Sequence, residues 1–498
     1  MTALEQAREA LLALGSAVIA NPRDAGTWTE FDRSLVTEPS ARIGVELQRA
    51  LAIALRADAL DPVDVPNVIH RTFASLVVLR RLSAARRQGR LADELAASTD
   101  GLDDPLLLLL LSRVRLFGVE LELLAVELRT WLLARTADPR VLPFAQALAA
   151  QCFANEYVYR VTREERARLE ELRVAPPSWW GAVVRACYEP LDAAAVALAP
   201  DDAAARDLVR TQILEPRRER ELVTASFGAI DDAVSVEVRA QYEARPYPRW
   251  TIARPDAQPL PGSLAPPRRM LVAGCGTGKH SLAVARTFPD AQVLAIDLSL
   301  ASLGYARRKT EEARVENLAF RHGDLLQIGE LGETFDAIEC VGVLHHLRDP
   351  IAGWRALLGV LRPGGWMKIG LYSANARRAV TAMRRELAAA HVGSDDDSIR
   401  ALRWRLLHDL ASPHSRWVAM CADFYDLSEC RDLLFHACEH VFTMQQIRRA
   451  LDDLALELVA IADPAPGRTV DDFAHAEVLE SADPDTFVRM VQFWVRRS

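Results

Sequence analysis

The sequence predicts an α/β fold: a doubly wound, mostly parallel sheet of seven strands, preceded by an all-α domain and carrying a helical insertion after the fifth strand. Two observations lead to this prediction. Apolar residues recur at helical spacing, with few β-branched runs, through the first 225 residues. After residue 268, short apolar runs alternate with helical stretches, which is the pattern of parallel strands joined by crossover helices.

Individual strands are predicted at short apolar runs that are separated by helical stretches. These runs lie at 270–273, 292–296, 318–321, 337–341, 366–371, 456–461 and 487–495. Helices are predicted between them wherever the apolar spacing changes to 3.6 residues. These stretches lie at 279–287, 300–313, 351–361 and 443–454.

Breaks and changes of composition divide the chain further. A helical N-terminal domain is predicted for 1–225, and a connector arm for 226–267. Within the arm, 241–267 holds seven prolines together with several aromatic residues, which disordered linkers normally lack. The arm therefore either packs against the next domain or closes over a site. The remaining predicted segments are a core (268–375), the helical insertion (376–440) and the end of the sheet (441–498).

Composition excludes several classes of protein. The 498 residues carry a net charge of −8, which gives no electrostatic reason to expect a nucleic-acid partner. No apolar run approaches the ~20 residues of a membrane span, and the N-terminus lacks the pattern of a secretory signal. The seven cysteines are scattered without a CxxC pair. We therefore expect a cytoplasmic protein with reduced thiols and no membrane partner.

The sharpest motif is the run Leu271-Val-Ala-Gly-Cys-Gly-Thr-Gly278, a strand that ends in three alternating glycines and enters a helix. Glycine permits the tight turn and lets a ligand approach the backbone. Asp297 ends the next strand, where a carboxylate can accept hydrogen bonds from both hydroxyls of a ribose. Asp324 follows the third strand, where it can meet an adenine amino group.

Two related glycine motifs do not match. A P-loop requires GxxxxGK[ST], but Ala273 stands at the first glycine position and His280 at the hydroxyl position. A dinucleotide fold requires GxGxxG, whereas the glycines here have the spacing GxGxG. Phosphate-loop and nicotinamide cofactors are therefore disfavoured.

Residues 268–372 resemble the class I S-adenosylmethionine-dependent methyltransferases. Six motifs in order carry the resemblance: GCGTG, the acid of AIDLS, the acid of GDLL, TFDAI, GVLHHL followed by Asp349-Pro350, and LRPGG. The resemblance implies a Rossmann-like fold and S-adenosyl-L-methionine as cofactor. It implies cofactor contacts from Gly274, Cys275, Gly276, Gly278, Asp297, Leu298, Asp324, Leu325 and Val341.

Outside this core, the chain resembles a group of bacterial methyltransferases with a helical, often tetratricopeptide-like, N-terminal region. The matching pieces are FANEYV (153–158), Tyr242-Glu243 with PYPRW (246–250), RDLLFH (431–436), Glu439-His440 and QFW (492–494). The repeat consensus itself is not legible. The resemblance therefore implies a helical domain and no particular repeat.

Methyl transfer is an in-line displacement that depends mainly on orientation and on the exclusion of water. A base is required only when the acceptor must lose a proton. His345 and His346 follow the fourth strand and Tyr372 follows the fifth, at the carboxyl edge where doubly wound sheets bind ligands. We predict these three as catalytic candidates. The alternative is that the histidines cap a helix or pack near the cofactor, and that Tyr372 only packs.

The arm and the insertion supply further candidates. Tyr242, Tyr247 and Arg249 of the arm could close over the cofactor, and an arginine can hold its carboxylate in a bidentate contact. The insertion run 423–440 either lines the acceptor pocket or forms a polar network. Its HxxEH sequence at 436–440 matches the inverted zincin signature and, if helical, would place both histidines on one face. We expect no metal site, because the zincin interpretation requires a separate protease domain.

The sequence therefore predicts an S-adenosylmethionine-dependent methyltransferase whose acceptor is an oxygen or nitrogen atom of a small molecule or peptide. Two alternatives remain open. One is a protein methyltransferase that binds a polypeptide partner through its helical domain. The other is a non-catalytic scaffold with a methyltransferase fold.

Overall fold

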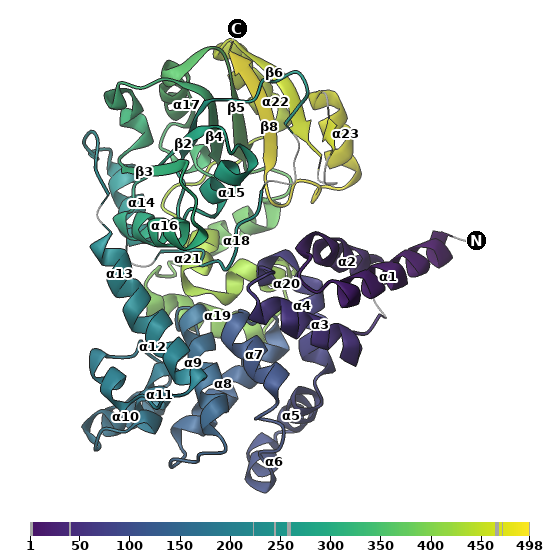
Figure 1. Ribbon diagram of the computed structural model, residues 1–498, viewed down its shortest axis with the longest axis vertical. Coiled ribbons are helices and arrows are strands. Elements are labelled where there is room, and N and C mark those ends of the chain that lie inside the picture. Colours follow the sequence, from purple (N-terminus) through teal and green to yellow (C-terminus); the bar gives the residue numbers. More distant parts are fainter. Residues whose placement is uncertain are drawn as a thin grey trace. The chain divides into compact units, whose positions relative to one another are not determined.

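The computed structural model describes most of the chain (Figure 1). The described residues are 3–38, 41–222, 224–243, 246–255, 260–463, 468–470 and 472–497. They form two compact units. Unit 1 comprises Met1–Glu215, Trp250–Ile252 and Val392–Cys430, and unit 2 comprises Pro216–Arg249, Ala253–His391 and Arg431–Ser498.

Unit 1 is built from helices, most of them short and several begun by a capping side chain. Thr162 and Glu165 form a reciprocal capping box at the start of one helix, and Asp104 caps another that has Pro105 in its first turn. The helices are α1 (Ala3–Ala20), α2 (Ala25–Thr37), α3 (Val45–Arg56), α4 (Pro66–Ser75), α5 (Val77–Arg87), α6 (Leu91–Ala97), α7 (Pro105–Arg113), α8 (Val119–Leu133), α9 (Leu142–Ala154), α10 (Arg163–Val174), α11 (Trp179–Ala186), α12 (Ala203–Val209), α19 (Asp396–His408) and α20 (Pro413–Met420).

A buried ion pair joins the insertion to the N-terminal helices within unit 1. Arg403 on α19 donates to both carboxylate oxygens of Glu122 on α8, at 2.9 and 2.6 Å, and the two side chains are 1% and 4% exposed. Arg403 also donates to the carbonyls of Val158 and Phe424. The two buried charges therefore compensate each other, and the remaining donors of Arg403 bond to backbone carbonyls, as the burial of an ion pair requires.

Unit 2 contains one eight-stranded sheet with the order β3-β2-β1-β4-β5-β8-β6-β7. The first five strands in that order are parallel, whereas β8 pairs antiparallel to both β5 and β6. The strands are β1 (Arg269–Ala273), β2 (Gln292–Asp297), β3 (Leu318–His322), β4 (Phe335–Val341), β5 (Leu361–Leu371), β6 (Leu456–Ala462), β7 (Thr469–Val470) and β8 (Val491–Arg497). The strand order reverses between β1 and β4, which is where open α/β sheets bind ligands.

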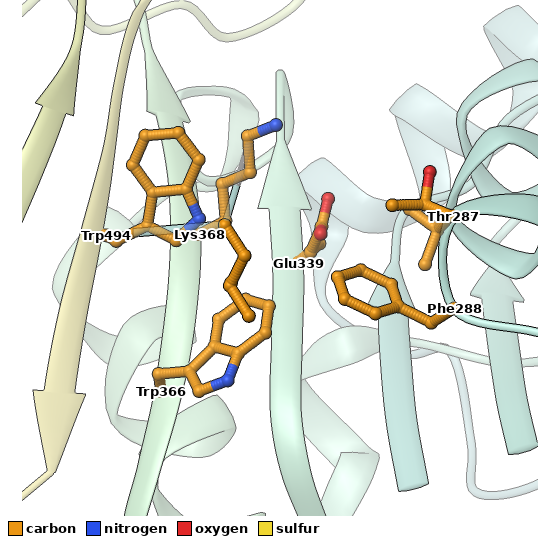
Figure 2. Close-up of a pocket in the computed structure, with 8 residues that line it drawn as sticks. Thr287, Phe288, Glu339, Trp366, Lys368 and Trp494 are labelled. Atoms are coloured by element: carbon orange, nitrogen blue, oxygen red, sulfur yellow. The ribbon is translucent and has the colours of Figure 1, made fainter. Parts of the chain in front are cut away.

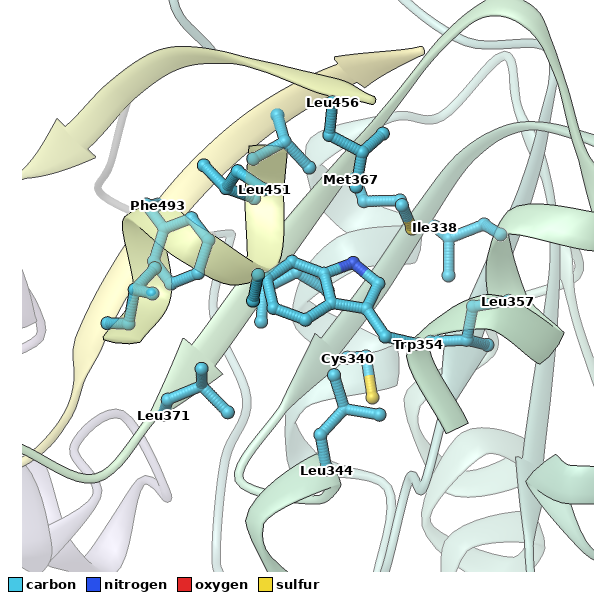
Figure 3. Packing of buried hydrophobic residues seen from close by; sticks show 14 of the residues in the cluster. Ile338, Cys340, Leu344, Trp354, Leu357, Met367, Leu371, Leu451, Leu456 and Phe493 are labelled. Carbon is cyan, nitrogen blue, oxygen red and sulfur yellow. The ribbon is translucent and has the colours of Figure 1, made fainter. Parts of the chain in front are cut away.

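Unit 2 also contains helices. They are α13 (Glu215–Glu221), α14 (Ala233–Glu243), α15 (Lys279–Thr287), α16 (Leu300–Ala313), α17 (Pro350–Val360), α18 (Arg378–Ala389), α22 (Met444–Asp453) and α23 (Phe473–Ala482), while α21 (Leu427–Phe435) runs across the boundary between the units. One face of the sheet carries the apolar core, in which Trp354 of α17 packs with Cys340, Phe493 and Leu451 (Figure 3).

The predicted α/β fold is confirmed, with two corrections. The sheet has eight strands and not seven, because the two-residue β7 pairs with β6 at an edge and is too short to give a periodic signal. The last strand begins at Val491 and not at residue 487. The segment boundaries drawn from the sequence stay a prediction. All seven cysteines are free thiols. Among the described residues, no helix has the length and apolar character that a membrane span needs.

Removing one partner of the buried pair should destabilise the protein strongly. We expect Arg403→Leu to lower the free energy of unfolding by about 3–5 kcal/mol, because it leaves the Glu122 carboxylate buried and unpaired. Urea denaturation of the full chain measures this. Two outcomes check the cause. The double variant Arg403→Leu with Glu122→Leu should recover most of the loss, and removal of the exposed Arg166–Asp397 pair should cost below about 1 kcal/mol.

Candidate active site

The glycine run after β1 forms a tight turn with free space beside it. Gly274, Gly276 and Gly278 have φ angles of 75°, 52° and 83°, in the left-handed region. A Cβ on Gly274 would lie 2.3 Å from a methyl group of Val343, so only glycine fits there. A Cβ on Gly276 would meet no atom within 4 Å. The backbone at Gly276 is therefore open to a ligand.

Asp297, at the end of β2, reaches this loop. Its Oδ2 accepts the Gly276 N–H at 2.7 Å and its Oδ1 accepts the Ser299 N–H at 2.9 Å. Burial raises the pKa of Asp297, and these N–H groups together with His322 partly offset the rise. Each carboxylate oxygen keeps a lone pair for a further donor such as a ribose hydroxyl. The structure thus brings the glycine loop and the predicted acid into direct contact.

Most of the other predicted cofactor contacts lie around the same edge of the sheet. Asp324 and Leu325 are buried just after β3, and the Asp324 carboxylate caps the following turn by accepting the Leu326 N–H. The Leu298 carbonyl contacts the His322 ring, and Val341 ends β4. Burial and the charge of Asp297 raise the pKa of Cys275 well above its ordinary value. Cys275 is therefore a thiol and not a nucleophilic thiolate.

The arm contacts both cofactor motifs. The Pro248 carbonyl accepts the Thr277 hydroxyl at 2.7 Å, and the Tyr242 carbonyl accepts the Ser299 hydroxyl at 3.3 Å. The Arg249 guanidinium lies 5.7 Å from the ring centroid of Tyr305. The arm therefore packs on the glycine loop and on the start of α16, and its closure over a cofactor stays a prediction.

Within the arm, Tyr242 and Tyr247 lie side by side, with ring centroids 5.4 Å apart. Burial and the carboxylate of Asp432 raise the pKa of both phenols well above the ordinary value. Both hydroxyls therefore stay protonated and act as hydrogen-bond donors near neutral pH.

His345 lies in the short 3-10 turn Leu344–His346 that follows β4, and it is fully buried. It stacks on Tyr372, with centroids 3.9 Å apart, and the Arg377 guanidinium lies 3.9 Å from the Tyr372 centroid. Neither ring nitrogen of His345 has a hydrogen-bond partner in the part of the chain that the structure describes. Burial, together with His346 and Arg377, lowers the pKa of His345 well below its ordinary value. His345 is therefore neutral at pH 7.

His346 also lies in this group, stacked on His436 with ring centroids 3.7 Å apart. The structure thus brings the three predicted catalytic candidates together, because His346 is also in edge contact with Tyr372. Sequence reasoning missed the specific partners in this group. Arg377 and Arg384 both pair with the buried Glu439, at 2.6 and 3.0 Å. Nothing in the sequence indicates that these two arginines share one carboxylate.

The sequence predicts a role for the run 423–440 as a whole and not for Asp432 in particular. In the structure Asp432 has a specific partner, because the Tyr242 hydroxyl donates to it at 2.9 Å and lies 3.2 Å from Nε2 of His436. A signal for this cluster exists in the sequence, since tyrosines in a proline-rich arm need a polar partner when they are buried. It does not say which acid supplies that partner.

The HxxEH sequence does not form a helix. Helix α21 ends at Phe435, and residues 436–440 run on as irregular chain. The shared helical face that the zincin interpretation requires is therefore missing. His346, Asp432 and His436 each offer one ligand atom, all within 4.8 Å of one another, which is metal-binding range. The prediction of no metal site stays a prediction.

A separate small pocket lies on the opposite face of the sheet from the Trp354 core (Figure 2). Glu339 of β4 and Lys368 of β5 are neighbours in register, and the Lys368 ammonium lies 5.2 Å from the ring centroid of Trp494. Glu339 also lies 2.7 Å from Nε2 of His280. Glu339 and Lys368 lie within their strands, whereas His280 lies in the first turn of α15, directly after the glycine loop.

Comparison with known proteins identifies the domain. A family model described as a methyltransferase domain matches residues 270–365. A protein of Synechococcus sp., described as uncharacterized, is 34% identical over 178 residues, which cover 32% of this chain and 43% of that protein. A ubiquinone biosynthesis O-methyltransferase of Paracidovorax citrulli is 32% identical over 117 residues, covering 23% of this chain and 48% of the relative. The chain therefore spans less than half the length of these relatives.

Among solved structures, PKMT2 from Rickettsia typhi in complex with AdoHcy is similar with a TM-score of 0.38 and 17% identity, over 51% of this chain and 55% of that one. The family match and the six motifs agree on the same residues. The chain contains a class I S-adenosylmethionine-dependent methyltransferase domain.

The buried, neutral state of His345 predicts a pH-dependent stability. Because its folded pKa is depressed, the unfolded chain binds a proton below about pH 6.5 that the folded chain does not. Stability is therefore lost as pH falls. His345→Leu removes this loss, and the variant should gain about 1.4 kcal/mol on the wild type between pH 7.5 and pH 5.5. Urea denaturation at both pH values measures the gain.

The exposed His475→Leu is the matched control for this comparison. A stability difference between His345→Leu and the wild type that does not change with pH would contradict the assignment of a neutral, buried imidazole.

Proposed function

We propose that the protein transfers a methyl group from S-adenosyl-L-methionine to an oxygen or nitrogen atom of a small molecule or peptide. The observation that carries this proposal is the open backbone at Gly276 beside the carboxylate of Asp297. A nucleoside needs both features: space at the glycine turn and an acceptor for its ribose hydroxyls.

The residues present fit this cofactor. Gly274, Gly276 and Gly278 would border its methionine end, Asp297 and Leu298 its ribose, and Asp324 with Leu325 its adenine. When bound, the cofactor supplies an activated methyl group on a sulfonium. Tyr247 and Arg249 of the arm would close over it, since Pro248 between them is already fixed to Thr277 of the glycine loop. Closure of this kind excludes water and orients the reacting atoms.

The acceptor would lie beside His345, His346 and Tyr372, at the carboxyl ends of β4 and β5. The name of the Paracidovorax relative refers to O-methylation, which supports an oxygen acceptor. We propose in addition that the helices of unit 1 take part in choosing the acceptor or a protein partner. A cytoplasmic location stays a prediction.

The cofactor assignment predicts a specific loss on changing Asp297. Calorimetric titration with S-adenosyl-L-methionine should show binding to the wild type, and a dissociation constant about 10- to 100-fold weaker for Asp297→Ala, because hydrogen bonds to a charged group contribute about 1.5–3 kcal/mol. The matched control is Asp290→Ala, an exposed acid in the turn just before the same strand. No binding by the wild type, or equal binding by Asp297→Ala, would refute the proposed function.

A further inference from the structure

The backbone of Cys438 contacts two stacked histidines in opposite senses. Its carbonyl oxygen lies 2.9 Å from Nδ1 of His346, and its N–H donates to Nδ1 of His436 at 3.1 Å. A carbonyl can only accept a hydrogen bond and an N–H can only donate one. One residue therefore determines the position of the proton on both imidazoles.

The two neutral rings must then be opposite tautomers. His346 carries its proton on Nδ1, so its Nε2 has a bare lone pair. His436 has the lone pair on Nδ1, so its proton is on Nε2. The hydrogen bond that one ring nitrogen makes sets the role of the other, as in other histidine sites where a carbonyl orients the ring.

In this tautomer, Nε2 of His436 is a hydrogen-bond donor. Its Nε2 lies 3.2 Å from the Tyr242 hydroxyl, which in turn donates to Oδ1 of Asp432 at 2.9 Å. The Tyr247 hydroxyl bonds to the same carboxylate. The hydrogen bonds thus run from His436 through Tyr242 to Asp432. A metal ion on Nε2 of His436 would displace this proton to Nδ1, where it would oppose the N–H of Cys438.

His346 is the histidine of this group whose Nε2 lone pair is left available by the hydrogen bond at Nδ1. Burial lowers its pKa well below the ordinary value, and the neighbouring His436 and the charges of Arg377 and Arg384 act in the same direction, whereas the Cys438 carbonyl opposes them. It is therefore uncharged near neutral pH. His345 differs from it, since neither of its nitrogens is held and its tautomer is not fixed.

We propose that Nε2 of His346 is the general base that removes the proton from a hydroxyl acceptor, and that the Cys438 backbone and the His436–Tyr242–Asp432 chain are its positioning residues. This inference rests on the proposed methyl transfer and names its acceptor class. An amine can lose its ammonium proton to solvent before the methyl group is transferred, so it does not need a base during the transfer itself. A hydroxyl becomes a strong nucleophile only as its proton leaves.

The step balances without a further reagent. The acceptor O–H proton moves to Nε2 of His346, and an oxygen lone pair forms the new bond to the methyl carbon. The carbon–sulfur bond breaks and leaves its electron pair on sulfur, which changes from a sulfonium to a neutral thioether. The products are a methyl ether, S-adenosylhomocysteine and an imidazolium, which then returns its proton to solvent.

The tautomers can be tested without an acceptor. In protein labelled with 15N-histidine and loaded with S-adenosylhomocysteine, two-bond 15N–1H spectra should show the proton of His346 on Nδ1 and that of His436 on Nε2. His346→Asn and His436→Asn variants assign the two signals. A proton on Nε2 of His346 would overturn the proposal whatever the protein methylates.

The base is tested with His346→Asn, because the asparagine amide can still donate to the Cys438 carbonyl while Nε2 is absent. With methyl-labelled S-adenosyl-L-methionine and the small-molecule fraction of a bacterial extract, we expect labelling to fall by about 10²- to 10⁴-fold. The affinity for the donor should stay within about 2-fold of the wild type, since His346 lies on the acceptor side. The exposed His475→Asn should label like the wild type.

The labelled product identifies the acceptor class. Hot hydriodic acid should release the label as volatile methyl iodide, as it does from O-methyl groups. Label that resists this treatment, or a His346→Asn variant as active as the wild type, would overturn the assignment of His346 as the base. Neither result would contradict the proposed methyl transfer. A wild type that binds no S-adenosyl-L-methionine would instead refute the proposed function, and the tautomer measurement would still decide the geometry.

Discussion

The candidate active site depends on the way residues 436–442 pair with the ends of two central strands. The His440 N–H donates to the His345 carbonyl at 2.8 Å, and the Phe442 N–H donates to the Tyr372 carbonyl, also at 2.8 Å. These bonds attach a segment from far along the chain to the turn that follows β4 and to the residue that follows β5. Because backbone bonds fix both position and direction, they hold His436 and Cys438 against His346.

The buried charges reinforce this placement. Glu439 accepts from Arg377 and Arg384, and Arg384 also donates to the His436 carbonyl at 2.6 Å. Buried ion pairs add little net stability, because desolvation offsets most of their attraction. Their effect here is on geometry, since the two ion pairs of Glu439 connect α18 with the segment that contains His436. Burial is the main reason that the pKa of His346 is low, and the two cations add to it, which leaves the ring uncharged with a lone pair available for chemistry.

How far the sequence predicts this structure depends on whether a feature is local. The glycine turn and Asp297 could be predicted because adjacent strands and a fixed turn decide their positions. The edge strand β7 could not, because two residues give no periodicity. The end of α21 at Phe435 could not either, because the residues that follow bond through their backbone to His345 and Tyr372, which lie far away in the sequence. For the same reason no sequence pattern reveals that one backbone fixes two histidine tautomers.

The arm joins what the sequence treats as two separate sites. The sequence allows two interpretations of the arm, packing against the domain or closing over a ligand. The contacts of the arm are compatible with both. Pro248 is bonded to the glycine loop, whereas Tyr242 is bonded through its carbonyl to Ser299 beside Asp297 and through its hydroxyl to Asp432. A segment that packs in this way already lies between the residues assigned to the cofactor and those assigned to the acceptor. Any displacement of the arm therefore removes contacts from both groups at once. The structural integrity of both groups of residues depends on this one shared segment.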